Sequence, residues 1–213
     1  MKSVSELLRL YAVTDRSWLN GRTLFDQVEE ALDGGATCVQ LREKSLDRDA
    51  FLQEAIEIAR LCHRHGVPLL INDDVDIARR SGADGVHVGQ DDMEAHLARE
   101  LLGPDMIVGV TAKTVEQALR AQEAGADYLG SGAVFGSSTK LNAKPMTKER
   151  LRSICDAVSI PVVAIGGINR NNLLELAGTG IHGVAVVSGI FAAADIEQEC
   201  RHLRMLSDQI VGR

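Results

Sequence analysis

Aromatic residues are scarce in this chain: they make up 3% of its 213 residues and include a single tryptophan, Trp18. Proteins that bind single-stranded nucleic acid stack bases on aromatic side chains, so the composition argues against that class. The chain also has 30 acidic residues against 23 basic ones, a net charge of −7, which disfavours general attraction to nucleic acid or to an anionic membrane. We expect neither as a partner, although local positive pockets are compatible with this charge.

Cysteine pairs are absent as well. The four cysteines, Cys38, Cys62, Cys155 and Cys200, lie far apart and form no C-x-x-C spacing. This arrangement fits reduced core thiols better than disulfides or zinc ligands. The sequence also has no G-x-S-x-G turn, so a serine nucleophile of that kind is not expected.

Long apolar runs, targeting signals and linkers are missing too. The charge-free stretch at 183–194 is shorter than the roughly 20 apolar residues of a membrane-spanning helix. Residues 1–10 contain Glu6 and Arg9 and no apolar signal core. We expect a soluble, cytoplasmic protein that forms one domain over residues 1–213. A homo-oligomer is compatible with the sequence, which leaves the oligomeric state open.

Short β-branched runs alternate with longer amphipathic stretches along the whole chain. The runs predict eight strands, at 10–13, 38–41, 68–72, 85–88, 106–110, 128–131, 162–165 and 183–187. Apolar residues at helical spacing predict helices between them, at 49–65, 75–80, 93–101, 114–124 and 171–177.

A short phrase, glycine followed by a small or apolar residue, recurs before several predicted strands. It stands at 35–37, 82–85, 125–128 and 180–183, where glycine can supply a left-handed helix cap. Eight predicted strands that alternate with helical stretches predict a single (β/α)8 TIM barrel. The competing fold, a doubly wound open sheet, would need a glycine-rich dinucleotide turn after the first strand. The chain has residues 14–17, Thr-Asp-Arg-Ser, at that place, so we prefer the barrel.

The residues after the second predicted strand are unusually polar. Strand alternation places Gln40, Arg42 and Lys44 on one side, with Glu43 facing the other way. Barrel enzymes carry their reactive groups at this carboxyl end. Two neighbouring cations favour an anionic ligand with more than one charge. A surface cation pair balanced by Glu43 and Asp47 is the structural alternative, and it is about as probable on these residues alone.

Acidic pairs follow the third and fourth predicted strands. Asp73 and Asp74 come after the third strand, and Asp91 and Asp92 come after the fourth. Carboxylates suit Mg²⁺, which binds through one or two of them together with phosphate oxygens. We assign Asp73 and Asp92 to this metal. Asp74 precedes the helix predicted at 75–80, and Asp91 or Asp92 precedes the one at 93–101, so these residues can also act as helix N-caps. We therefore assign Asp74 and Asp91 to helix capping or to supporting contacts.

The last three loops predict phosphate contacts. The loop at 136–145 is rich in hydroxyls and contains Lys140, which suits a lid over a phosphorylated substrate. Glycine-containing turns at 166–167 and 188–189 follow the seventh and eighth strands, where barrels commonly bind phosphate. A flexible loop and ordinary turns are the structural alternatives. Anion sites on two sides of one barrel mouth indicate two phosphorylated ligands, or one ligand phosphorylated at both ends.

His87 is the one histidine inside a predicted strand. In a polar barrel interior such a histidine is more often structural than a ligand. The other five histidines show no H-E-x-x-H grouping, so we predict no zinc site.

Several short motifs occur together in order: Tyr-Ala-Val-Thr-Asp at 11–15, Gln-Leu-Arg-Glu-Lys at 40–44, Ile-Asn-Asp-Asp at 71–74, Gly-Val-His-Val-Gly-Gln at 85–90, Ser-Ser-Thr-Lys at 137–140 and Ala-Ile-Gly-Gly-Ile at 164–168. With these motifs the chain resembles the thiamine phosphate synthase (thiamine-phosphate pyrophosphorylase) family over nearly its whole length. The resemblance implies a (β/α)8 barrel transferase of thiamine biosynthesis. Such an enzyme joins hydroxymethylpyrimidine diphosphate to thiazole phosphate, or to its carboxylated tautomer, with Mg²⁺, and releases pyrophosphate and thiamine monophosphate.

The resemblance also implies roles for individual residues. It assigns the pyrimidine diphosphate to Gln40, Arg42, Glu43, Lys44, Asn72, Thr111 and Lys140. It assigns the thiazole phosphate to Ser137, Ser138, Thr139, Gly167, Val187 and Ser188, and it assigns Mg²⁺ to Asp73 and Asp92. Arg42, Lys44, Lys140 and Thr111 are the expected catalytic residues.

Two positions depart from the family pattern. Lys113 stands where the family often has histidine, and Gly136 replaces a common proline before the hydroxyl-rich loop. Thr111 stands where serine is frequent, which keeps the hydroxyl. These departures predict a different contact at Lys113 and a more mobile lid.

The chemistry of these residues and the family resemblance predict the same type of reaction. Diphosphate leaves readily once Mg²⁺ and the cations Arg42, Lys44 and Lys140 take up its charge. The C–O bond can then break first, and the thiazole nitrogen captures the pyrimidine methylene cation. This route needs no protein nucleophile.

Two other functions fit parts of the pattern. A thiazole tautomerase of the same barrel family would share the thiazole phosphate site without needing a diphosphate and metal site. A non-catalytic sensor of a phosphorylated ligand would have no reason to pair carboxylates. The combination of Asn72, Asp73, Asp92 and Lys140 favours the synthase.

Overall fold

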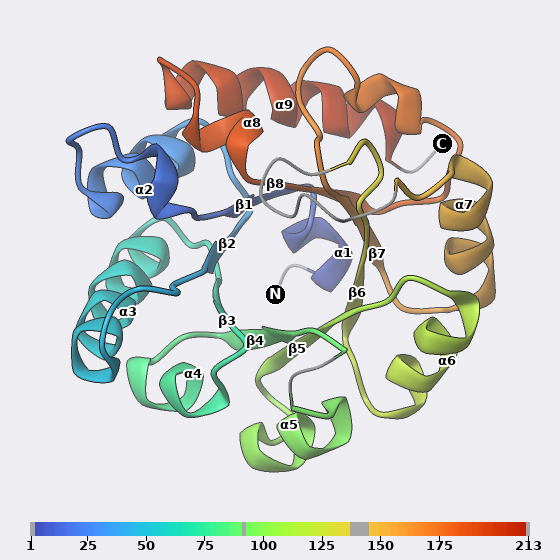
Figure 1. Ribbon diagram of the computed structural model, residues 1–213, viewed down its shortest axis with the longest axis horizontal. Coiled ribbons are helices and arrows are strands. Elements are labelled where there is room, and N and C mark those ends of the chain that lie inside the picture. The colour runs from blue at the N-terminus through green and yellow to red at the C-terminus, as the bar shows by residue number, and fades with distance from the viewer. Residues whose placement is uncertain (1–2, 91–92, 137–144, 212–213) are drawn as a thin grey trace.

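Eight parallel strands close into a barrel in chain order, each paired with the next and β8 with β1 (Figure 1). The computed structural model describes residues 3–90, 93–136 and 145–211. The strands are β1 (Leu10–Val13), β2 (Cys38–Leu41), β3 (Leu69–Asn72), β4 (Gly85–Val88), β5 (Ile107–Thr111), β6 (Tyr128–Gly132), β7 (Val162–Ile165) and β8 (Gly183–Val186). This is the TIM barrel that the sequence predicts.

Helices surround the barrel, as Figure 1 shows. They are α2 (Leu24–Asp33), α3 (Arg48–Arg64), α4 (Val75–Ser81), α5 (Ala95–Leu102), α6 (Val115–Glu123), α7 (Lys148–Ala157) and α9 (Ile196–Ile210). Shorter turns are α1 (Val4–Leu7), α8 (Ser188–Phe191) and the 3₁₀ helices η1 (Arg16–Trp18) and η2 (Leu173–Leu176). No helix in the described ranges has the length and apolarity needed to cross a bilayer.

The predicted strands agree with the structure to within one residue at each end. Three of the four turns that carry the recurring glycine phrase end a helix as predicted. Gly35, Gly82, Gly125 and Gly180 all have positive φ, between 78° and 93°. Glycine adopts this conformation without a Cβ penalty, so α2, α4 and α6 can end beside the first three and the chain can turn into the next strand. The helix cap predicted at Gly180 is wrong, because η2 ends at Leu176.

One helix prediction was wrong, and a second was correct except for its start. Residues 171–177 contain only the 3₁₀ helix η2. The asparagines before it occupy backbone groups: Asn169 N–H donates to Asn172 Oδ1 and Asn171 N–H donates to Asn169 Oδ1, each at 2.9 Å. Such local bonds compete with helix formation.

The fifth helix begins at Ala95 rather than at 93, with Glu94 in an extended conformation at its N-cap. Met93 and Glu94 are exposed, so no buried apolar contact draws this turn into the helix. The prediction that Asp91 or Asp92 caps this helix is therefore wrong. Both aspartates lie outside the described residues. Asp74, in contrast, caps α4 as predicted, because its Oδ1 accepts the Ile77 N–H at 2.9 Å.

Alternating strand residues build two separate cores. Outward residues such as Leu10, Ala12 and Leu129 pack under the helices in one large apolar cluster. Inward residues form a smaller cluster: Leu8, Tyr11, Val13, Cys38, Leu70, Tyr128, Val163 and Ala185. The inner cluster includes two tyrosine hydroxyls, so the barrel interior is partly polar before any loop is considered.

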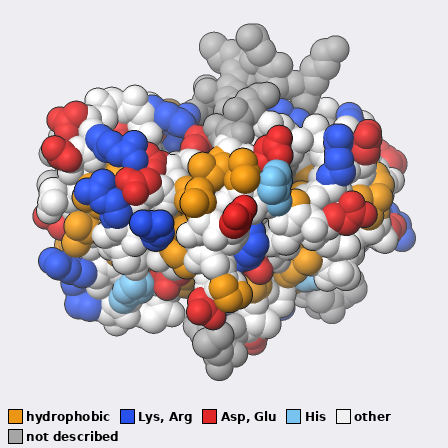
Figure 2. Space-filling view, turned by 90° about the horizontal axis from the view of Figure 1, so that it is seen from below, with side chains coloured by type: hydrophobic (Ala, Val, Ile, Leu, Met, Phe, Trp, Pro, Cys, Tyr) orange, Lys and Arg blue, Asp and Glu red, His pale blue; other side chains and the backbone are white. Residues whose placement is uncertain are grey.

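The outer surface mixes charges of both signs. Figure 2 looks onto the side at the bottom of Figure 1, where α4 and α5 lie, and shows hydrophobic side chains among Asp, Glu, Lys and Arg. Leu97 and Leu101 on α5 are 43% and 49% exposed. Exposed leucines are common on protein surfaces, so these two do not by themselves indicate a site.

Candidate active site

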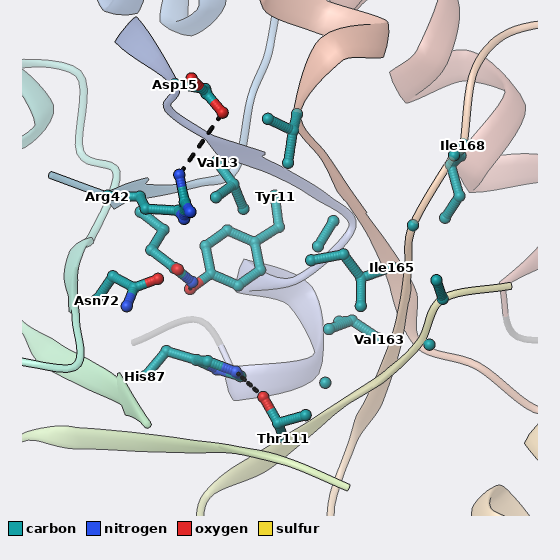
Figure 3. Close-up of a pocket in the computed structure, with 18 of the residues that line it drawn as sticks. Tyr11, Val13, Asp15, Arg42, Asn72, His87, Thr111, Val163, Ile165 and Ile168 are labelled. Carbon is teal, nitrogen blue, oxygen red and sulfur yellow. Dashed lines mark hydrogen bonds and ion pairs between the residues drawn. The ribbon is translucent and has the colours of Figure 1, made fainter. Parts of the chain in front are cut away.

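A pocket opens at the carboxyl end of the barrel (Figure 3). Its polar wall consists of Gln40, Arg42, Asn72, His87 and Thr111, from β2 to β5 and their loops. Its glycine wall consists of Gly130, Gly132, Ala133, Gly166 and Gly167, from β6, β7 and the residues after them. The rest of the lining is Tyr11, Val13, Asp15, Lys113, Val163, Ile165, Ile168, Ala185, Val187 and Ser188.

Both predicted substrate sites meet in this pocket. Gln40, Arg42, Asn72 and Thr111, expected at the pyrimidine diphosphate, line it together with Gly167, Val187 and Ser188, expected at the thiazole phosphate. Two separate cavities would have kept the reacting atoms apart. The shared pocket is therefore the geometry that a two-substrate reaction requires.

Arg42 is held at the pocket by the first loop of the barrel. Its backbone N–H donates to Thr14 Oγ1 at 2.9 Å, and its guanidinium Nη1 lies 3.6 Å from Asp15 Oδ2 (Figure 3). The Asp15 side chain is 8% exposed and also accepts the Ser17 N–H of η1. Asp15 therefore restrains the guanidinium without burying it, because the Arg42 side chain is still 26% exposed.

Lys44 and Asp73 lie beside each other outside the pocket lining. Lys44 Nζ donates to Asp73 Oδ2 at 2.7 Å. Asp73 has a left-handed backbone, with φ of 65°, and its N–H donates to the His87 carbonyl at 2.9 Å. Non-glycine residues in this conformation are uncommon and concentrate at functional sites.

Glu43 faces away from the pocket, as strand alternation predicts. Its side chain is 2% exposed and forms an ion pair with Arg16 of η1. Its Oε1 accepts the backbone N–H groups of Lys44 and Leu46 at 2.7 and 3.1 Å, and it also accepts the N–H and hydroxyl of Ser45. Burial alone would raise the pKa of Glu43, but Arg16 and these donors lower it to about 2. Glu43 thus organises the loop that carries Lys44, and the structure does not bring it to the pocket.

The pocket floor contains residues that the sequence analysis missed or classed as structural. Tyr11 and His87 line the pocket, and the Tyr128 ring packs against the His87 ring, with ring centroids 5.5 Å apart. Hydrogen bonds join these three side chains to Gln40 and Thr111. Strand alternation, which turns Tyr11, His87 and Tyr128 inward, was the available signal.

Close backbone approach shapes the glycine wall. Gly166 has φ of 104°, and a Cβ there would lie 2.5 Å from the Ala133 Cβ. Gly167 has φ of 69°, and its Cβ would lie 2.8 Å from the Phe135 carbonyl oxygen. Both glycines therefore serve packing against the end of β6, and they also leave backbone open to the pocket. The packing and phosphate-binding explanations are compatible here.

Part of the predicted site lies outside the described residues: Asp92, Ser137, Ser138, Thr139 and Lys140. Within the described ranges, no group of three or more His, Cys, Asp or Glu side chains is arranged to hold a metal ion. Lys113 lines the pocket, and Gly136 has φ of 84° in open space.

Fold and pocket together define a (β/α)8 barrel protein with polar and backbone groups gathered at the carboxyl ends of its strands. The family model described as "Thiamine monophosphate synthase" matches residues 10–190. A thiamine-phosphate synthase of Ruminiclostridium cellulolyticum is 50% identical over 194 residues, 91% of this chain and 92% of the relative. One from Clostridium tetani is 47% identical, over 91% of this chain and 93% of the relative.

A solved structure is similar over the whole fold. The thiamine phosphate pyrophosphorylase of Pyrococcus furiosus superposes with a TM-score of 0.91 at 36% identity, over 99% of this chain and 100% of that protein. The chain belongs to the thiamine monophosphate synthase family.

Proposed function

We propose that this chain is a thiamine phosphate synthase, which joins hydroxymethylpyrimidine diphosphate to thiazole phosphate and releases pyrophosphate and thiamine monophosphate. The observation that carries this proposal is the shared pocket, in which residues expected at each substrate face one another. Curated relatives that share about half of its residues bear the same activity in their names. We propose that residues 1–213 act as one catalytic domain on these small phosphorylated substrates.

The polar wall binds the pyrimidine diphosphate in this proposal. Arg42 enters the pocket already oriented by Asp15, and Lys44 stands on the loop that Glu43 organises. Lys140 supplies a third cation. As the C–O bond breaks, charge develops on the leaving diphosphate, and these three cations stabilise it more strongly than they stabilise the bound substrate.

Gln40, Asn72 and Thr111 supply the neutral contacts to the same substrate. Their amides and hydroxyl line the pocket beside Arg42. Such groups orient a ligand without adding charge, which suits the aminopyrimidine part of the molecule. Glu43 acts on this substrate only indirectly, through the loop that carries Lys44.

The glycine wall and the start of α8 bind the thiazole phosphate. Gly167, Val187 and Ser188 offer backbone groups from the loops after β7 and β8, where a short helix begins. The first N–H groups of a helix have no partner within it, so they can donate to phosphate oxygens. Ser137, Ser138 and Thr139 complete this site, which holds the thiazole nitrogen toward the pyrimidine methylene carbon.

The acidic residues fit a magnesium ion. Asp73 offers a carboxylate next to Lys44, a residue proposed to contact the same diphosphate. One or two carboxylates with phosphate oxygens are a typical Mg²⁺ environment, so Asp73 and Asp92 would hold the ion against the substrate. When bound, Mg²⁺ neutralises charge on the leaving diphosphate. Lys44 and Asp73 also neutralise each other before substrate arrives.

No side chain has to attack the substrate in this reaction. Once the diphosphate departs, the ring electrons of the aminopyrimidine stabilise the methylene cation, and the thiazole nitrogen captures it. The protein contributes charge stabilisation, alignment of two substrates and exclusion of water from the cation.

Purified protein mixed with both substrates and Mg²⁺ tests the function. We expect stoichiometric pyrophosphate and thiamine monophosphate. Isomerisation of the thiazole without pyrophosphate would establish a tautomerase instead, and binding without any reaction would establish a sensor.

Asp73→Ala tests the metal assignment. It should abolish Mg²⁺-dependent turnover and leave thiazole phosphate binding intact by calorimetry. Asp74→Asn, which keeps the cap of α4, is the matched control and should stay active. Unchanged turnover of Asp73→Ala at low Mg²⁺ would refute the assignment.

A further inference from the structure

A continuous chain of hydrogen bonds crosses the interior of the barrel beneath the pocket. Gln40 Nε2 donates to the Tyr11 hydroxyl at 2.6 Å, and that hydroxyl lies 2.9 Å from the Tyr128 hydroxyl. Tyr128 lies 2.8 Å from His87 Nδ1, and His87 Nε2 lies 3.0 Å from Thr111 Oγ1. The chain thus begins and ends on residues of the polar wall. The sequence contains only two tyrosines, and both are in it.

Neighbouring glycines make room for these rings. A Cβ on Gly109 would lie 2.1 Å from Cζ of Tyr128, and a Cβ on Gly130 would lie 2.9 Å from Cε1 of His87. Tyr11 and Tyr128 pack edge to face, with centroids 6.0 Å apart and an interplanar angle of 74°. Steric fit therefore holds the rings in place independently of their hydrogen bonds.

The two tyrosine hydroxyls of this hydrogen-bond chain stay protonated. Tyr11 and Tyr128 are 1% and 0% exposed. Burial raises the pKa of each well above the ordinary value for tyrosine. Each phenol therefore keeps one hydrogen to donate and can accept another.

The order of donors follows from counting hydrogens. The Gln40 amide nitrogen can only donate, so the Tyr11 oxygen accepts. Among the described residues, the Tyr11 hydroxyl contacts no acceptor other than the Tyr128 oxygen, so it donates there. Tyr128 then donates to His87 Nδ1. That leaves the imidazole proton on Nε2, which donates to Thr111 Oγ1. The Thr111 hydroxyl hydrogen remains available to the pocket.

We propose that Tyr11, Tyr128 and His87 are positioning residues whose hydrogen-bond chain fixes the amide of Gln40 as an acceptor and the hydroxyl of Thr111 as a donor toward the pyrimidine diphosphate. This inference rests on the proposed function. Nε2 of Gln40 gives one of its two hydrogens to Tyr11, which fixes the orientation of the amide, and its Oε1 then accepts from the substrate amino group. The hydrogen-bond chain therefore determines that Gln40 presents an acceptor, and Thr111 a donor, on opposite sides of the pocket.

Steady-state kinetics of Tyr11→Phe and Tyr128→Phe test the proposal. Each keeps the ring and removes one hydroxyl, which takes part in two hydrogen bonds of the hydrogen-bond chain. We expect KM for the pyrimidine diphosphate to rise about 5- to 10-fold, the value of one or two lost hydrogen bonds, with KM for thiazole phosphate changed less than about twofold. Leu8→Val is the control, because Leu8 belongs to the same inner cluster and its side chain has no atom that can donate or accept a hydrogen bond. It should lower the melting temperature without separating the two KM values.

A spectroscopic measurement on the wild-type protein tests the proton order directly. The ¹⁵N shifts of the His87 imidazole, assigned by comparison with His87→Gln, report which nitrogen carries the proton. We expect the Nε2–H tautomer in wild type and a shifted Nδ1 resonance in Tyr128→Phe. An Nδ1–H tautomer in wild type would overturn the order.

Failure of this inference can be separated from failure of the proposed function. If wild type releases pyrophosphate but the phenylalanine variants raise both KM values equally, or neither, the positioning role is wrong. If wild type releases no pyrophosphate, the proposed function is wrong, while the ¹⁵N experiment still decides the proton order.

Discussion

The two walls of the pocket are built by opposite means. On the polar wall, long side chains from β2 to β5 point inward and are held by partners, as Asp15 holds Arg42 and Tyr11 holds Gln40. On the glycine wall, four of the five residues have no side chain, and at Gly132, Gly166 and Gly167 backbone atoms come within 3 Å of where a Cβ would stand. We therefore expect the polar wall to lose function when side-chain atoms are removed, and the glycine wall to lose stability and function when atoms are added.

Among substitutions in the two walls, the largest expected effect is the loss of a cation from the polar wall. Arg42→Ala should lower kcat/KM for the pyrimidine diphosphate about 10³-fold, because developing charge on the leaving group loses a preoriented partner. Pyrophosphate release measures this. Arg48→Ala removes a cation whose side chain is 59% exposed, on the neighbouring helix, and is the control. An equal loss in both variants would mean that net charge, and not the pocket wall, matters.

Adding one methyl group should damage the glycine wall. In Gly166→Ala the new Cβ overlaps Ala133, and the backbone conformation is strained. We expect a loss of about 3–4 kcal/mol in unfolding free energy, measured by denaturant titration, and a raised KM for thiazole phosphate. Gly178→Ala has φ of 77° in open space and should show the backbone cost alone. Equal losses in the two variants would remove close approach as the reason for glycine at 166.

A smaller, pH-dependent effect is expected behind the polar wall. The pKa of Glu43 is lowered to about 2, so its contribution is present above the unfolded pKa near 4.5 and is lost as pH falls toward 2. Glu43→Gln should therefore be less stable by about 2–3 kcal/mol at about pH 6, and the difference should shrink as pH falls below about 4.5. Denaturant midpoints of both proteins across this range measure it. A difference independent of pH would exclude the ion pair with Arg16 as its cause.

The smallest expected effect is on the orientation of Arg42. Asp15→Asn keeps the size of the side chain and its acceptor for Ser17 but removes the charge opposite the guanidinium. An ion pair at 3.6 Å that is partly exposed contributes about 0.5–1 kcal/mol, so KM for the pyrimidine diphosphate should rise about two- to fivefold. A change larger than that of Arg42→Ala would show that Asp15 acts on the substrate directly.

Most of the fold could be predicted because local signals agree with it. The eight strands follow from β-branched runs, and four turns follow from a repeated glycine whose backbone needs positive φ. The segment at 171–177 could not be predicted in the same way. Its apolar spacing is helical, but asparagine side chains occupy the backbone groups that a helix would use.

The site was predictable where strand alternation decides direction. That rule places Gln40 and Arg42 at the pocket and turns Glu43 away from it. The role of Glu43 could not be read from sequence, because its partner Arg16 comes from another loop. The joining of Tyr11 to Tyr128 likewise depends on strands 117 residues apart that meet only when the barrel closes. The roles of Asp92 and Lys140 stay predictions.

One feature of the first loop gives the protein a built-in optical probe. Trp18 is the only tryptophan in the sequence and ends the 3₁₀ turn η1, whose first residue, Arg16, binds Glu43 and whose cap, Asp15, faces Arg42. Its emission therefore originates from a single place, the turn that follows Asp15 of the pocket lining. A diphosphate that draws Arg42 away from Asp15 should alter the surroundings of the indole. Stopped-flow fluorescence can thus follow arrival of the first substrate without any attached dye.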